Sequence, residues 1–272
     1  MDGYGGMAAL YFIVSIMIAA TVDLTTRRTV CSAIAPMMAE PRISAPMTSQ
    51  LIAGAVVTVF EDRGDWVHVR STDDYDGWLH VGYLTATSGD EGLWRISLGV
   101  VVKGANGVER ALPLGARLAP SDDVLHGDAV DADERNTRFG RRANAIAHSA
   151  ATLFSGASYL WGGGTPWGCD CSGFVQSVYA LHGVMLPRDA WQQAEVGTRV
   201  GDTPIEAQLA GDLLFFSDRD DRRVTHVGVA LDEERMVHSS LRRGGIAIET
   251  WSSADDIAKR LHDQCVGVHR VV

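Results

Sequence analysis

Short runs of alternating or continuous hydrophobic residues fill the first third of the chain. Residues 56–60 are apolar and mostly β-branched, residues 61–65 carry turn-forming Asp and Gly, and residues 66–70 alternate with a period of two. A further apolar run occupies residues 78–81. Because such short strands separated by tight turns are typical of small barrels, residues 28–87 are predicted to form one β-module.

A second, divergent copy of this pattern follows. The run Leu-Ile-Ala-Gly-Ala at residues 51–55 is echoed by Leu-Pro-Leu-Gly-Ala at residues 112–116. The echo predicts another small β-module over residues 88–120. Residues 121–137 contain six acidic residues before position 136 and little apolar pattern, so they are predicted to be a linker.

The hydrophobic period changes in the C-terminal half. Apolar residues recur at helical spacing over residues 139–154, with Gly156 as a stop, and again over residues 174–181, with Gly183 as a stop. Strand-like runs then occupy residues 213–216, 226–231, 236–238 and 246–248. Helices first and strands afterwards predict an α+β domain over residues 138–272.

Residues 1–27 form an apolar N-terminal segment whose most hydrophobic part is residues 8–22. That part is short for a membrane span, and the charges around it differ from those of a signal peptide: Asp2 precedes it and Arg27 and Arg28 follow it. The sequence favours a cytoplasmic protein, with export or membrane association through residues 8–22 as the alternative.

Composition narrows the classes of partner. The 272 residues carry 24 basic and 34 acidic side chains, a net charge of −10, and the basic residues form no stripe, which argues against nucleic acid as a partner. Four cysteines are too few for a disulfide scaffold in a chain of this length. A single bridge between Cys31 and Cys265 stays possible at this point.

Cys171 is the first candidate for chemistry. It begins the second predicted helix, and Asp170 before it is a natural N-cap. A helix N-terminus carries partial positive charge and free N–H groups, which lower the pKa of a thiol and can hold an oxyanion. From position alone, however, Cys171 could equally be a small buried apolar residue.

His226 and His238 are candidates for a base and its orienting partner. His226 opens an alternating strand in which Val227 and Val229 point to the opposite face. The two histidines lie an even number of residues apart in a predicted hairpin, so they share one face of the sheet. His238 can therefore hold the His226 ring in the tautomer that pairs with Cys171.

Metal binding is the rival chemistry for these residues. Cys169, Cys171 and the two histidines supply four ligands of the kind that zinc prefers. The spacing argues against it, because alternate side chains diverge and the usual Cys-Cys spacing is wider. No metal or cofactor is predicted.

Four motifs in the C-terminal half, in this order and spacing, resemble those of the NlpC/P60 peptidases. They are Tyr-Leu-Trp-Gly-Gly at 159–163, Asp-Cys-Ser-Gly-Phe-Val at 170–175, Gly-Asp-Leu-Leu-Phe-Phe at 211–216 and His-Val-Gly-Val at 226–229. The resemblance covers residues 138–272. It implies an α+β, papain-like fold, with Cys171 as the nucleophile, His226 as its base and His238 as the third catalytic residue.

The two N-terminal modules resemble bacterial SH3-like domains. Two such modules before this peptidase are similar to the γ-D-glutamyl-L-diamino acid endopeptidases, which implies a murein peptide with a free N-terminal L-Ala as substrate and no required protein partner. The subgroup's Arg-Asp-Ser appears here as Arg188-Asp189-Ala190, so Asp189 is expected to pair with the substrate ammonium. The other residues expected at the substrate cleft are Tyr83, Tyr159, Trp161, Asp170 and Ser172.

Alternatives accompany these assignments. Asp189 could only cap a helix that begins at Ala190, and Tyr83 could belong to the core of the first module. The whole protein could bind cell-wall peptides without cutting them, or it could use the same thiol as an acyltransferase or amidase.

Overall fold

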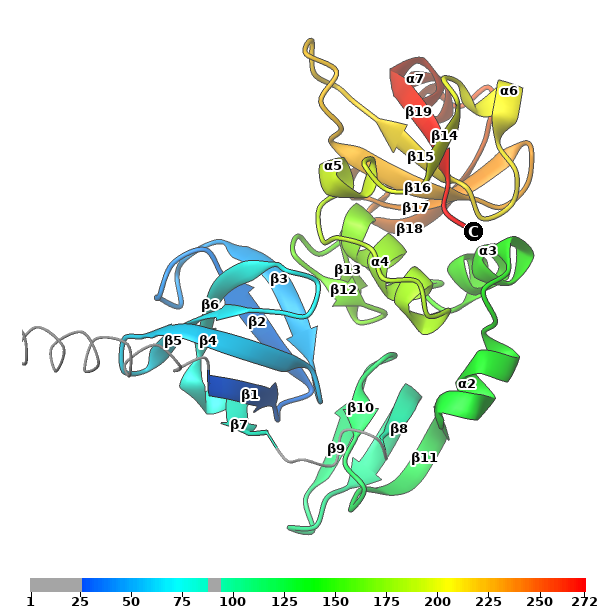
Figure 1. Cartoon of the computed structure of the whole chain (residues 1–272). Helices are drawn as coiled ribbons and strands as arrows, with labels where there is room; N and C mark the ends of the chain where they lie inside the picture. The colour runs from blue at the N-terminus through cyan, green and yellow to red at the C-terminus, as the bar shows by residue number, and fades with distance from the viewer. Residues whose placement is uncertain (1–25, 88–93) are drawn as a thin grey trace, which may run out of the picture.

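The computed structural model describes residues 26–87 and 94–272 (Figure 1). The apolar segment at residues 8–22 therefore lies outside the described residues, and its predicted location stays a prediction. Within the described ranges, no helix is both long enough and apolar enough to cross a membrane.

The N-terminal domain is a seven-stranded antiparallel sheet with the strand order β3-β2-β6-β5-β4-β1-β7. Val67 and Val69 of β5 are buried in its core with Leu79 of β6, whereas the intervening His68 is only half-buried, as the alternating pattern predicts. The elements are β1 (Thr26–Val30), β2 (Ile34–Met38), β3 (Met47–Ile52), β4 (Val56–Asp62), β5 (Trp66–Arg70), β6 (Asp76–His80), η1 (Val81–Tyr83) and β7 (Leu84–Ala86).

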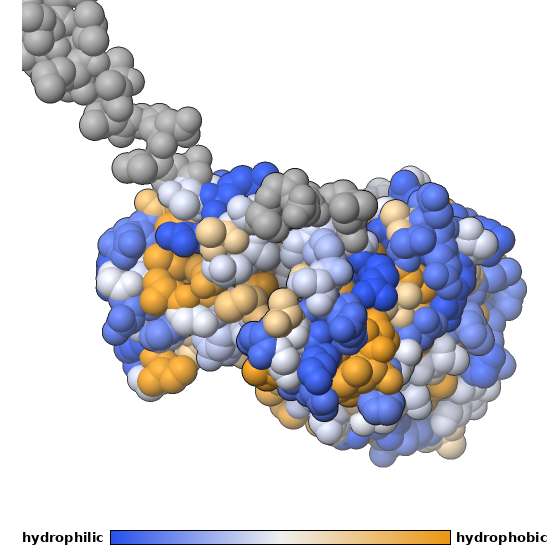
Figure 2. Space-filling model, turned by 90° about the horizontal axis from the view of Figure 1, so that it is seen from below, coloured by the Kyte–Doolittle hydropathy of each residue, from blue (hydrophilic) through white to orange (hydrophobic). Residues whose placement is uncertain are grey.

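A second β-region lies beside the first, where β8 pairs with three neighbouring strands. Its core includes a residue of the N-terminal domain, since Ala53 packs in one cluster with Val100, Val102 and Leu112. In the view from below, apolar residues form separate patches among hydrophilic ones (Figure 2). The strands are β8 (Arg95–Lys103), β9 (Glu109–Leu112), β10 (Arg117–Leu118) and β11 (Asp123–Val130).

The prediction that residues 121–137 form a linker is wrong about their secondary structure. They contain β11, which pairs along β8, and most of helix α2 (Ala132–Arg138). Most residues of β11 are exposed, so its sequence lacks the buried alternation by which a strand is recognised. The boundaries of the domains themselves stay a prediction.

The C-terminal domain is α+β. Its sheet has the order β14-β19-β15-β16-β17-β18, and helix α4 packs on one face, where Phe174 and Val178 meet Val227, Val229 and Val237. Helix α7 packs on the other face through Leu261. The elements are α3 (Ala143–Thr152), β12 (Gly164–Thr165), β13 (Gly168–Cys169), α4 (Cys171–Leu181), α5 (Ala190–Gln193), β14 (Thr198–Gly201), α6 (Pro204–Ala207), β15 (Leu213–Phe216), β16 (His226–Ala230), β17 (Arg235–Ser240), η2 (Leu241–Arg243), β18 (Gly245–Thr250), α7 (Asp256–Gln264) and β19 (Cys265–Arg270).

Polar contacts hold the N-terminal domain against the start of the C-terminal domain. The Nε2 of Gln176, on α4, donates to Asp73 Oδ2 at 2.7 Å, and the backbone N–H of Gly164 donates to Gln50 Oε1 at 3.4 Å. The domain therefore sits beside helix α4, which begins at Cys171, and beside strand β12, which precedes it.

Candidate active site

Cys171 is the first residue of helix α4, as predicted. Asp170 is its N-cap, and the Oδ1 of Asp170 accepts a hydrogen bond from the backbone N–H of Gly173 at 2.8 Å. This cap accounts for where the helix begins. The thiol is only 8% exposed, so the cap presents it at the floor of a cavity rather than on the surface.

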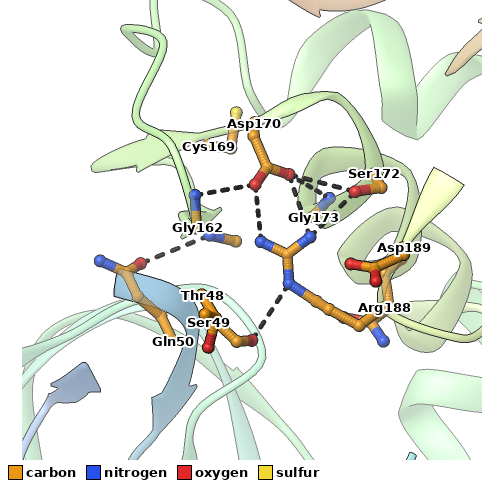
Figure 3. A network of polar contacts seen from close by, with 12 residues as sticks. Thr48, Ser49, Gln50, Gly162, Cys169, Asp170, Ser172, Gly173, Arg188 and Asp189 are labelled. Carbon is orange, nitrogen blue, oxygen red and sulfur yellow. Dashed lines mark hydrogen bonds and ion pairs between the residues drawn. The ribbon is translucent and has the colours of Figure 1, made fainter. Parts of the chain in front are cut away.

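Arg188 is a buried hub that joins the two domains around this cap (Figure 3). Its guanidinium donates to Asp170 Oδ2 at 2.7 Å and Oδ1 at 3.1 Å, and to the hydroxyl of Ser172 at 2.9 Å. Its Nε donates to the hydroxyl of Ser49, on strand β3, at 3.1 Å. Asp170 Oδ2 also accepts from the backbone N–H of Gly162 at 2.8 Å.

This network changes the interpretation of Asp170 and Ser172. Both line the cavity, as expected, but the structure already engages the Asp170 carboxylate fully. Their first task is therefore to hold the start of α4 and the loop before it. The sequence did not assign this role to Arg188, because its partners at Ser49 and Asp170 are distant in the chain.

A cavity of about 660 Å³ opens in front of Cys171. Cys171, His226 and Asp189 all line it. The remaining predicted residues on its walls are Tyr159, Trp161, Asp170 and Ser172. The N-terminal domain also contributes to the lining, through Thr48 and Tyr75, which the sequence analysis did not identify.

Tyr83 is not among the residues that line this cavity. It lies in η1, half-buried against the core of the N-terminal domain, with its ring near that of His80. The aromatic residue that reaches the cavity from this domain is Tyr75, just before β6. Both tyrosines sit near short strands, so only the docking of the domain decides which one faces the peptidase.

Asp189 both caps a helix and lines the cavity. It is the N-cap of α5, where its backbone N–H donates to Gln192 Oε1 at 3.1 Å, and its side chain also lines the cavity. The Tyr75 hydroxyl interacts with Asp189 and Thr48, and burial together with the Asp189 charge raises the pKa of Tyr75. A carboxylate and a neutral phenol thus lie together at the end of the cavity that the N-terminal domain covers.

The two histidines meet as the hairpin predicts. Strands β16 and β17 are antiparallel with Val229 opposite Val237, which places His226 diagonal to His238. His226 Nε2 lies 2.7 Å from His238 Nδ1. His238 is fully buried, and its Nε2 lies 3.2 Å from Oε1 of Glu249, a buried residue of β18 that the sequence analysis missed.

Burial dominates the electrostatics of the cysteine and its neighbouring histidine. Burial and the nearby Asp170 charge raise the pKa of Cys171 to about 12, although backbone N–H groups of Val227 and Ser172 oppose the rise. Burial and the adjacent His238 lower the pKa of His226 to about 3. Desolvation of the thiolate therefore opposes the low thiol pKa expected from the helix N-terminus. Burial thus favours the neutral form of both the thiol and the imidazole.

The other cysteines take no part in this arrangement. All four are free thiols, with Cys31 exposed and Cys265 buried, so the possible bridge between them does not form. Across residues 26–87 and 94–272, no three His, Cys, Asp or Glu side chains are grouped so that they could hold a metal ion.

Known proteins are similar to this chain in sequence and in fold. The NlpC/P60 family matches residues 156–262, and the bacterial dipeptidyl-peptidase SH3 domain matches residues 37–84. The chain is 29% identical over 226 residues to a gamma-D-glutamyl-L-lysine dipeptidyl-peptidase of Bacillus cereus, covering 71% of this chain and 67% of that protein. It is 33% identical over 152 residues to a probable endopeptidase NlpC homolog of Haemophilus influenzae, covering 51% and 76% respectively.

A solved structure agrees in fold. An NlpC/P60 family protein from Bacillus cereus superposes with a TM-score of 0.73, covering 90% of this chain and 99% of that chain at 19% identity. This chain belongs to the NlpC/P60 family. The resemblance inferred from the four motifs, and the α+β fold with an SH3-like N-terminal region, are thereby confirmed.

Proposed function

We propose that the protein is a cysteine endopeptidase that hydrolyses the γ-D-Glu–diamino acid bond of murein-derived peptides with a free N-terminal L-Ala. Two observations support the reaction: Cys171 and His226 line one cavity, and His238 contacts the second ring nitrogen of His226. The Bacillus cereus relative is named for the γ-D-glutamyl-L-lysine bond.

The proposed steps start from a protonated Cys171 thiol, the form that burial favours. The proton of the Cys171 thiol passes to His226 as sulfur attacks the γ-carbonyl carbon, and the carbonyl electron pair moves to oxygen. Free N–H groups at the start of α4 stabilise that oxyanion. The C–N bond then breaks as His226 gives its proton to the leaving amine, and water, deprotonated by His226, hydrolyses the thioester.

The proposed specificity for a free N-terminal amine rests on the cavity residues that belong to the N-terminal domain. Thr48 and Tyr75 line the cavity beside Asp189, so a peptide there would meet the N-terminal domain and a carboxylate together. A free ammonium would pair with Asp189, whereas an acylated amine would leave that carboxylate unpaired. Ala190 removes the hydroxyl that the related Arg-Asp-Ser motif places next to it.

Mass spectrometry of tripeptide digests tests this function. L-Ala-γ-D-Glu-L-Lys and its meso-diaminopimelate counterpart should release the dipeptide L-Ala-D-Glu with the wild-type protein and not with Cys171→Ala. The N-acetylated peptides should be cleaved at least about tenfold more slowly, since a lost charged hydrogen bond costs about 1.5–3 kcal/mol. Equal cleavage of free and acetylated peptides contradicts the proposed specificity. Binding without any cleavage contradicts the peptidase function itself.

A further inference from the structure

A line of buried polar groups continues from His226 into the protein interior, beyond the residues that touch the cavity. His238 Nε2 lies 3.2 Å from Glu249 Oε1, and both residues are almost completely buried. Arg243 then donates to both oxygens of Glu249, at 2.8 Å each. On its exposed side, Arg243 also donates to Asp255, with one contact at 3.3 Å.

The Glu249 carboxylate determines which nitrogen is the donor in each hydrogen bond along this line. An ionised carboxylate only accepts hydrogen bonds, so the His238 nitrogen beside Glu249 must carry a proton. In a neutral ring the other nitrogen, Nδ1, is then an acceptor. It faces Nε2 of His226 at 2.7 Å, so that nitrogen must be the donor. Nδ1 of His226 is left with its lone pair.

That lone pair is what the reaction needs. His226 Nε2 is occupied by His238, so only Nδ1 of His226 is available to take the proton of Cys171. If His238 adopted the opposite tautomer, it would donate to His226 Nε2. The proton of His226 would then sit on Nδ1, where it would prevent His226 from acting as a base.

Arg243 makes this arrangement compatible with neutral histidines. Its guanidinium neutralises the Glu249 charge, so the carboxylate does not demand a second proton on His238. Hydrogen bonds from His238 and Arg243 outweigh the effect of burial and lower the pKa of Glu249 to about 2. The carboxylate is therefore ionised, and an acceptor only, at neutral pH.

We propose that Glu249 is a positioning residue that fixes the tautomers of His238 and His226, and thereby leaves Nδ1 of His226 free to act as the base for Cys171. Glu249 touches neither the cavity nor a substrate, so its influence passes entirely through His238. The expected effect of Glu249 on kcat rests on the proposed peptidase function. Its expected effect on the histidine tautomers can be tested without substrate.

The first test is NMR of the full chain labelled with ¹⁵N, without substrate. Long-range ¹H–¹⁵N correlations distinguish protonated from bare ring nitrogens, and His226→Gln and His238→Gln variants assign the signals. The wild type should show protonated Nε2 and bare Nδ1 in both rings. Glu249→Met, which removes the acceptor at similar volume, should move the His238 proton to Nδ1. The matched control Asp255→Asn changes the outer partner of Arg243, keeps an N-cap side chain for α7, and should leave both tautomers unchanged.

The second test separates kcat from KM on L-Ala-γ-D-Glu-L-Lys. Because Glu249 acts on the base and not on binding, Glu249→Met should lower kcat by about 10- to 100-fold or more, with KM changed less than about threefold. Glu249→Gln, which keeps an acceptor oxygen, should recover part of that loss. Asp255→Asn should stay within about twofold of the wild type.

Three outcomes would overturn the proposal. One is a wild-type spectrum with a proton on Nδ1 of His226, and another is a folded Glu249→Met whose tautomers and kcat match the wild type. The third is a wild-type spectrum with a proton on Nδ1 of His238, which decides against the proposal even if Glu249→Met does not fold. A wild type that cleaves no peptide but shows the expected tautomers contradicts the proposed function alone.

Discussion

The two walls of the cavity are built in different ways. The wall proposed to be catalytic, here called the catalytic wall, contains Cys171 of helix α4 and His226 of strand β16, with His238 buried behind His226. The opposite wall, around Asp189, needs Thr48 and Tyr75 from a separate domain. The reacting groups are thus fixed inside one fold, whereas the groups proposed to select the substrate depend on how two domains dock.

Arg188 connects these two walls. It contacts Ser49 on the side of the N-terminal domain and Asp170 with Ser172 on the side of the nucleophile (Figure 3). Changes on the catalytic wall should therefore affect every substrate alike, and changes on the opposite wall should alter only selectivity. Changes at the hub should affect both.

Replacing the nucleophile should have the largest effect. Cys171→Ala removes the group that forms the thioester, so hydrolysis of free and acetylated peptides should both fall by at least about 10³-fold. Rates from quantitative mass spectrometry check this, with Cys31→Ala, an exposed thiol, as the matched control at wild-type activity. If the variant still hydrolysed the acetylated peptides alone, the catalytic wall would not act on both substrates alike.

Removing the hub should come next. Arg188→Met leaves the buried Asp170 carboxylate without its partner, which costs about 3–5 kcal/mol of unfolding free energy. Urea denaturation monitored by circular dichroism measures the loss. The control is Arg219→Met, whose exposed pair with Asp221 should contribute little to the unfolding free energy. Equal losses in the two variants would argue against Arg188 as the connection.

A change on the opposite wall, around Asp189, should alter selectivity alone. Asp189→Asn keeps an N-cap for α5 but removes the negative charge. Cleavage of the free-amine tripeptide should fall about 10- to 100-fold, while cleavage of the N-acetyl peptide stays near its wild-type value. The ratio of the two kcat/KM values measures the effect. A parallel fall in both would place Asp189 on the catalytic wall instead.

The pH dependence of alkylation should report the buried thiol. Because burial raises the pKa of Cys171 to about 12, the thiolate fraction without substrate should grow about tenfold per pH unit above pH 7. The rate of iodoacetamide labelling of Cys171 should follow this rise, measured by peptide mapping between pH 6 and 9 at constant ionic strength. A plateau below pH 7 would instead indicate a preformed thiolate–imidazolium pair.

The smallest effect distinguishes the two tyrosines. Tyr75→Phe removes the hydroxyl that interacts with Asp189 and should raise KM for the free-amine peptide by about two- to tenfold. Tyr83→Phe makes the same chemical change outside the cavity and should leave kinetics unaltered. The opposite result would restore Tyr83 as the substrate residue of the N-terminal domain.

Local sequence patterns predicted the catalytic wall well. Asp170 before an apolar helical stripe predicted the N-cap and the start of α4 at Cys171, and the even spacing of two histidines predicted their shared face. These features depend on interactions between residues close in the chain, where capping and side-chain alternation act directly. By contrast, β11 escaped prediction because it is an exposed strand with no buried face to pattern it.

The sequence by itself determined the family, the α+β class and the cysteine–histidine pair, because capping, periodicity and short motifs are local properties. Only the tertiary structure decided that Tyr75 rather than Tyr83 reaches the cavity and that Glu249 lies behind His238. It also decided that Arg188 binds Ser49, 139 residues away in the chain. The physical reason is that these contacts arise when separate elements pack together and exclude water. The same exclusion of water raises the pKa of the Cys171 thiol, although the helix start alone predicted a fall.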